Sequence, residues 1–143
     1  MSNNYNLNDE LSLLIRRFIE MKNLDEEDSI EFNPGASIIE IENFENKNNF
    51  RLPPQIKEWL IFTDGCLLFD SIIQFYGVAH KPFIDFNPKG IPKGYIKIGA
   101  FNFGDAICIQ ENLSTIVQYG ESLIEYNDLE EFLEYVIEIG IED

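Results

Sequence analysis

Few residues in this sequence have the type and spacing needed for acid–base or nucleophilic chemistry. His80 is the single histidine, and it stands beside Lys81 in a segment rich in proline and glycine. A hydrolase requires a nucleophile beside a base, or two carboxylates in different environments. Cys66 and Cys108 are distant from His80 along the chain, so only the folded structure could pair a cysteine with it. We therefore expect no catalytic residues and no enzyme activity, with His80 at the surface or in a capping role.

The sequence also predicts no metal site and no bound cofactor. Four acids stand together at residues 25–28, but the alternating oxygen ligands and central glycine of a calcium loop are missing. One histidine and two separated cysteines are too few for a structural zinc site. The glycines form neither a G-x-G-x-x-G motif nor a P-loop. The acidic run is therefore interpreted as a solvated linker.

Charge is the strongest feature of the composition. The formal net charge is −16 at pH 7, and residues 98–143 contain 11 acidic residues and no basic residue. Such a chain repels nucleic-acid phosphates and anionic membranes, so we expect neither as a partner. It attracts a basic protein surface. The alternative interpretation is that the acids only keep a small protein soluble.

Length and composition favour one domain over residues 1–143, because a chain of this size can bury a hydrophobic core. Residues 1–10 are polar and lack the basic start of a signal peptide, and no apolar run is long enough to span a bilayer. Cys66 and Cys108 are isolated in apolar surroundings, which is typical of reduced core cysteines. We therefore expect a cytoplasmic protein.

Helical periodicity predicts three helices in the first half of the chain. Apolar residues at helical spacing mark the first, over residues 7–22. Ser37 and Glu40 have the S-x-x-E spacing of a capping box before the second. Prolines at 53–54 suit the first turn of the third, and Gly65 suits the left-handed position beyond its end. The two prolines and the glycine are thus interpreted as structural residues.

The later sequence predicts strands and then a closing helix. Residues 79–94 are rich in proline and glycine and predict a long irregular loop. Breaks of a few residues separate the later strands, which indicates hairpins in an antiparallel meander of about five to six strands. A C-terminal helix packed on this sheet gives an α+β fold. The predicted strands are 67–69, 72–78, 95–101, 106–110, 115–119 and 122–126.

Several short motifs follow one another in a fixed order along most of the chain. These are I-x-x-I-E-x-F-E at 38–45, Leu52-Pro53, Trp59-Leu60, Asp64-Gly65, Ile98-Gly99, Gly104-Asp105, Val117 and Leu129-x-x-Phe132-Leu133. No single motif is specific, but the ordered set resembles the SUKH superfamily of Smi/Knr-type domains. The resemblance is strongest over residues 37–137 and points to the bacterial immunity-protein branch.

This resemblance implies protein binding rather than catalysis. Bacterial members of the superfamily are similar to immunity proteins, which are encoded beside polymorphic or contact-dependent toxins and block the toxin in the cytoplasm. Many of those toxins are nucleases, so the resemblance implies a cognate toxin, and the charge adds a preference for a basic one. Fungal relatives are regulatory scaffolds, so a non-catalytic scaffold using the same acidic surface is the alternative. The sequence leaves the oligomeric state open.

The closing helix carries the predicted partner-binding surface. Asp128 is suited to its N-cap, with Glu131 three residues later. At about 100° per residue, Glu130, Glu134 and Glu138 share the outer side, where their repulsion costs a few tenths of a kcal/mol per pair. The alternative is an ordinary solvated face. The predicted inner side is Leu129, Phe132, Leu133, Val136 and Ile137, and the predicted partner-binding set is Glu125, Asp128, Glu130, Glu131, Glu134, Tyr135 and Glu138.

Overall fold

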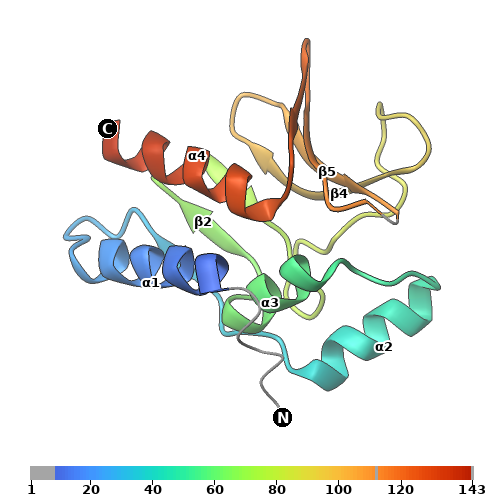
Figure 1. The fold of residues 1–143 in the computed structure, drawn as a ribbon, viewed down its shortest axis with the longest axis horizontal. Helices are drawn as coiled ribbons and strands as arrows, with labels where there is room; N and C mark the ends of the chain where they lie inside the picture. The colour runs from blue at the N-terminus through green and yellow to red at the C-terminus, as the bar shows by residue number, and fades with distance from the viewer. Residues whose placement is uncertain (1–8, 112, 143) are drawn as a thin grey trace.

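The computed structural model describes residues 9–111 and 113–142 as four helices and a seven-stranded antiparallel sheet (Figure 1). Each strand pairs with the next along the chain, so the sheet is a simple meander. The predicted α+β class is confirmed. The helices are α1 (Asp9–Asn23), α2 (Ile38–Asn48), α3 (Pro54–Phe62) and α4 (Leu129–Glu142). The strands are β1 (Glu31–Phe32), β2 (Cys66–Leu68), β3 (Ile73–Phe75), β4 (Tyr95–Phe101), β5 (Ala106–Gln110), β6 (Ile116–Tyr119) and β7 (Leu123–Tyr126).

The helix starts agree with their sequence signals. At the start of α2, the Glu40 N–H donates to Ser37 Oγ at 3.0 Å, and the Ser37 N–H donates to Glu40 Oε1 at 2.9 Å. This is the predicted capping box. The prolines at 53–54 occupy the cap and first turn of α3. Gly65 has the expected positive φ of 97°. The C-cap of α3 is Thr63, in an extended conformation, so Gly65 lies between the cap and the start of β2.

The sheet differs from the prediction by its extra strand. The described residues form seven strands where the sequence predicts five to six, because β1 pairs with β2 and begins the meander. With two residues, β1 is too short to show alternation in the sequence. The 79–94 loop is irregular as predicted, and an isolated bridge joins its Asp85 to Lys97 of β4. Residues 7–8 of the first predicted helix lie outside the described residues.

Helices α1, α3 and α4 contact one another and pack their apolar sides on one face of the sheet (Figure 1). Trp59 of α3 is 2% exposed, and its ring meets the rings of Phe18, Phe62 and Phe75 at centroid distances of 5.4, 5.4 and 5.3 Å. The tryptophan is therefore a core residue. The opposite face of the sheet carries a smaller buried cluster of Ala106, Cys108 and Val117.

Candidate protein-interaction surface

Asp64, two residues after α3, fastens the start of the 79–94 loop. Its side chain is fully buried, and its carboxylate accepts the backbone N–H groups of Val78 at 2.7 Å, Ala79 at 2.9 Å and His80 at 2.8 Å. The His80 Nδ1 atom also lies 2.8 Å from Asp64 Oδ2. A Cβ atom at Gly77 would lie 2.5 Å from the Asp64 carbonyl oxygen, so only glycine fits there. His80 is thus part of a structural anchor.

The two cysteines lack the surroundings of a nucleophile. Cys66 and Cys108 are both buried and free of disulfide bonds. Burial raises the pKa of both thiols, that of Cys108 to about 11 even though the Lys97 charge acts in the opposite direction. Both thiols are therefore protonated near neutral pH, whereas the thiolate is the reactive form. They are core residues, as the sequence predicts.

The acidic run at 25–28 shapes a turn. Asp25 accepts the Ile30 N–H at 2.9 Å and the Ser29 hydroxyl at 3.0 Å. Within residues 9–111 and 113–142, no cluster of three or more His, Cys, Asp or Glu side chains could hold a metal ion. The described helices also include none that is long and apolar enough to cross a membrane.

Helix α4 has the two sides that its periodicity predicts. All five predicted inner residues are buried, and the exposed residues Glu134, Tyr135 and Glu138 lie on the other side. Asp128 and Glu131 cap the helix. The Glu131 N–H donates to Asp128 Oδ1 at 2.9 Å, and the Asn127 N–H donates to Glu131 Oε1 at 3.0 Å. These two members of the predicted partner-binding set therefore already support the fold.

Glu130 lies against α1. Partial burial raises the pKa of its carboxyl, and the charges of Asp128, Glu10 and Glu134 raise it further. A hydrogen bond between the Glu10 and Glu130 side chains acts in the same direction. Several acidic side chains thus lie close together where α1 meets α4, and the repulsion between their charges lowers the stability of the folded state. Glu10 was not predicted as a member of this surface, because the contact depends on how two distant helices pack.

The sheet separates Glu125 from the other predicted partner-binding residues. Tyr126 faces α4, where its ring stacks on Tyr135 with centroids 5.6 Å apart. Successive side chains of a strand point to opposite faces. Glu125 therefore points to the other face, where it is paired in register with Val117. The remaining six members lie on α4 or at its cap.

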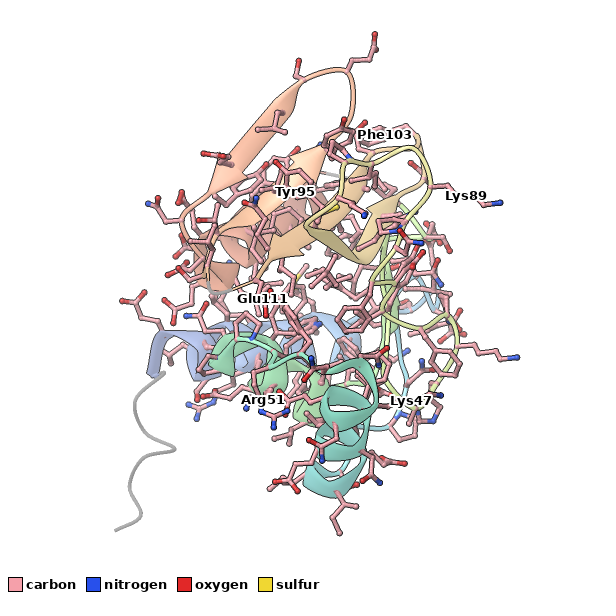
Figure 2. The ribbon with its side chains drawn as sticks, turned by 90° about the vertical axis from the view of Figure 1, so that its right-hand side faces the viewer. Lys47, Arg51, Lys89, Tyr95, Phe103 and Glu111 are labelled. Carbon is pink, nitrogen blue, oxygen red and sulfur yellow. The ribbon has the colours of Figure 1, made fainter. Side chains whose placement is uncertain are left out.

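Basic side chains come from other elements. Figure 2 shows Lys47 on α2, Arg51 on the α2–α3 linker and Lys89 on the 79–94 loop. Helix α4 and strand β7 contribute no lysine or arginine, since none follows Lys97 in the sequence. Helix α4 and strand β7 therefore carry acids but no positive charge of their own, and basic residues near α4 come from the contacting helix α1.

The SMI1 / KNR4 family (SUKH-1) matches residues 35–135, which is well over half of the chain. The chain belongs to this family. The SUKH-1 match begins just before α2 and ends within α4. Each of its two ends lies two residues from the corresponding end of the region 37–137, where the sequence motifs predict the resemblance. A search of the curated proteins finds no relative that matches the chain.

Helix α1 lies outside the SUKH-1 match but is integral to the core. Its residues Leu11, Leu14 and Phe18 are buried. They are held against α3 and α4, the helices that α1 contacts. Glu10, which faces Glu130, is thus brought to the acidic surface by a helix that precedes the matched region.

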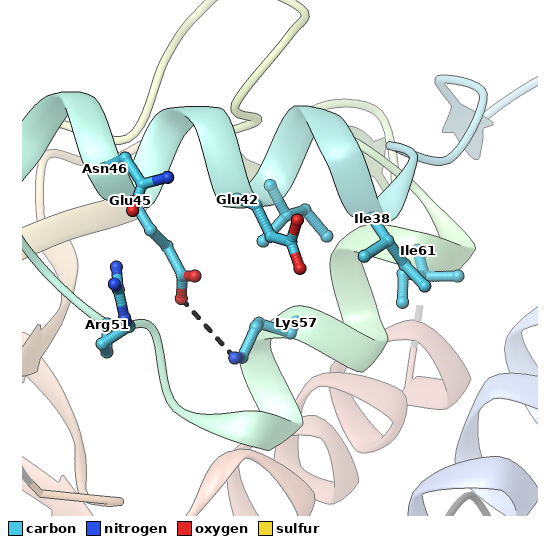
Figure 3. Close-up of a pocket in the computed structure, with 8 residues that line it drawn as sticks. Ile38, Glu42, Glu45, Asn46, Arg51, Lys57 and Ile61 are labelled. Atoms are coloured by element: carbon cyan, nitrogen blue, oxygen red, sulfur yellow. Dashed lines mark ion pairs between the residues drawn. The ribbon is translucent and has the colours of Figure 1, made fainter.

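A pocket lies between α2 and α3 of this SUKH-1 domain, and its central acidic side chain makes contacts that hold the fold together (Figure 3). Glu45 is buried there; it accepts the Leu52 N–H at 2.7 Å and lies 3.6 Å from the Lys57 Nζ atom. These contacts fasten the α2–α3 linker to both helices, so the central carboxylate already has its partners. The pocket has a volume of about 370 Å³ and is lined by Ile38, Ile41, Glu42, Glu45, Asn46, Arg51, Lys57 and Ile61.

Proposed function

We propose that this protein is a cytoplasmic immunity protein that binds a cognate toxin domain and neutralises it by protein–protein contact, without catalysis. Membership of the SUKH-1 family is consistent with this role. The net charge of −16 favours a basic partner. A nuclease is basic where it holds nucleic-acid phosphates, so a nuclease toxin suits this surface.

The observation that carries the proposal is the uncompensated negative charge at α4. Across the described residues, the ion pairs between lysine and a carboxylate are Lys22–Asp28 and Lys57–Glu45. Neither of them includes an acid that follows Lys97. The Glu130 carboxyl instead lies near the like charges of Asp128, Glu10 and Glu134. Glu138 follows Glu134 by four residues on the same side of α4. A basic partner would relieve this repulsion, which gives both affinity and faster association.

Tyr135 adds an aromatic contact to the proposed surface. It is 36% exposed and is held in place by its stack on Tyr126. Tyrosine is enriched among the residues that dominate protein interfaces, because its ring offers a large contact area with a polar end. We therefore assign Glu130, Glu134, Tyr135 and Glu138 to the centre of the contact, with Asp128 and Glu131 at the helix start and Glu125 across the sheet.

Replacing Glu130, Glu134 and Glu138 by glutamine tests this assignment. We expect association with the toxin domain encoded beside this chain to slow about threefold to tenfold at low salt, with a flatter salt dependence, because electrostatic steering is lost. Stopped-flow fluorescence measures both. The control is the triple variant Glu20→Gln, Glu26→Gln, Glu27→Gln, which removes the same charge from exposed positions elsewhere. Equal effects of both triple variants would refute a local role for α4.

The same variant tests the strain at Glu130. Its pKa is raised in the folded protein, so its ionisation destabilises the fold at neutral pH. The glutamine variant should therefore have a higher Tm than wild type at pH 7. This advantage should shrink as the pH falls through the raised folded-state pKa and disappear below the ordinary pKa of glutamate, where Glu130 is protonated both folded and unfolded.

A further inference from the structure

Strand β7 is an open edge of the sheet. Among the described strands it pairs with β6 alone, and Figure 1 shows the β6–β7 hairpin in orange-red rising above the helices. At the hairpin end, the Gly120 N–H donates to the Ser122 carbonyl at 3.2 Å. Backbone directions alternate along an antiparallel ladder. The N–H and C=O groups of Ile124 therefore point toward β6, and those of Leu123 and Glu125 point toward the open edge.

Among the described residues, this edge has only part of the protection that normally prevents strand pairing. Natural edges are protected by short length, charged side chains, proline, a bulge or a covering segment. Strand β7, which reads Leu-Ile-Glu-Tyr, has the short length and the charge of Glu125 but no lysine or proline. Leu123 and Ile124 are 49% and 42% exposed, and they point to opposite faces of the sheet. An added strand would therefore meet free backbone groups and apolar contacts on both faces.

Charge indicates which strand this edge would accept. Glu121 and Glu125 are exposed along it, and the Tyr126–Tyr135 stack joins it to the acidic outer side of α4. We propose that β7 binds an extended basic segment of the partner protein as an additional antiparallel strand. This contact mode rests on the proposed function, since it concerns the same partner, and it adds backbone pairing to the electrostatic attraction.

A second copy of this chain is a poorer occupant of the edge. Pairing two β7 strands would bring Glu121 and Glu125 of one copy toward the same acids of the other. Like charges opposed across a strand pair are destabilising, whereas lysine or arginine opposite glutamate is favourable. The edge therefore selects a basic strand over its own copy.

A capped synthetic peptide of alternating lysine and valine is the probe for this edge. Its alternation places lysines beside Glu125 on one face and valines beside Ile124 on the other. Glu125→Pro removes an outward N–H and leaves the β6–β7 ladder intact, as proline does on edge strands. Glu125→Gln removes the same charge and keeps the N–H. By titration calorimetry, we expect Glu125→Pro to weaken peptide binding at least about tenfold relative to Glu125→Gln.

Amide hydrogen exchange in the wild-type chain tests the same point without a substitution. The amides of Leu123 and Glu125 should exchange rapidly in the free protein and become protected by the lysine–valine peptide. A peptide of alternating lysine and proline, which has the charge but cannot pair as a strand, should leave them unprotected. Equal affinities of the two Glu125 variants, or no gain in protection, would overturn the proposal. Protection of these amides without peptide, in a dimer, would assign the edge to a second copy.

These outcomes separate this inference from the proposed function. If the toxin domain encoded beside this chain binds and protects α4 but leaves Leu123 and Glu125 exchanging freely, strand addition is wrong and the immunity role stands. If the peptide protects β7 while that toxin domain does not bind, the edge accepts basic strands and the immunity role fails.

Discussion

Replacing Asp64 by alanine should lower the free energy of unfolding by about 3–5 kcal/mol. The substitution leaves the backbone N–H groups of Val78, Ala79 and His80 without their acceptor, and each unsatisfied donor costs about 1–3 kcal/mol when buried. The buried Val78 donor should dominate, since the other two are partly accessible to water. Urea unfolding followed by circular dichroism measures the change.

Asp85→Ala is the matched control for this prediction. Asp85 is exposed, and among the described residues its carboxylate accepts the Asn87 N–H at 2.9 Å, so the loss of this side chain should cost less than about 1 kcal/mol. Asp64→Asn should fall between the two, because its amide oxygen still accepts while its NH₂ group faces donors. An Asp64→Ala variant as stable as Asp85→Ala would show that the 79–94 loop is held in another way.

Replacing Trp59 by alanine should also cost about 3–5 kcal/mol, because it opens a cavity where α1, α3 and the sheet meet. The ring is packed edge-on against Phe18, Phe62 and Phe75, and each such aromatic pair adds to the burial term. Thermal melting and urea unfolding should both report the loss.

Trp59→Phe separates the ring's packing from its polar group. The Trp59 Nε1 atom is buried without a hydrogen-bond partner among the described residues, so phenylalanine removes an unsatisfied donor along with part of the ring. We expect a cost below about 1.5 kcal/mol, since a large apolar ring is retained. A Trp59→Ala variant that stays fully stable and loses only partner binding would instead mark Trp59 as an interface residue.

The sequence predicts elements best where local signals agree. Ser37 and Glu40 form the expected capping box, and the five apolar residues of α4 are buried on the expected side. Both predictions use residues within a few positions of one another, so helical geometry alone places them. Strand β1 is different, because its two residues form a strand only by pairing with β2, which is distant in the sequence.

The candidate surface was predictable only in part, for the same reason. The outer side of α4 follows from helical periodicity, which places Glu134, Tyr135 and Glu138 together. The position of Glu125 behind the sheet depends on strand direction and register, and the approach of Glu10 to Glu130 depends on how α1 packs. Neither arrangement has a local signal.

The anchor at Asp64 shows the same limit. An aspartate before glycine is typical of a turn, and the sequence places Gly65 just beyond the end of a helix. Its four contacts come from residues 78–80, far along the chain and beyond two strands. Only the folded sheet brings that loop to the end of α3. The single histidine, which the sequence offers as the main candidate for chemistry, is thereby engaged in the fold.

Co-expression of this chain with the C-terminal domain of the protein that the adjacent gene encodes, expressed at a level that kills cells, tests the central claim most directly. We expect the wild-type chain to restore cell survival, and the variant Glu130→Gln, Glu134→Gln, Glu138→Gln to restore less at equal expression. The control variant with glutamine at 20, 26 and 27 should protect as wild type does. Cell death despite full expression of the wild-type chain would contradict the immunity role and favour a regulatory scaffold.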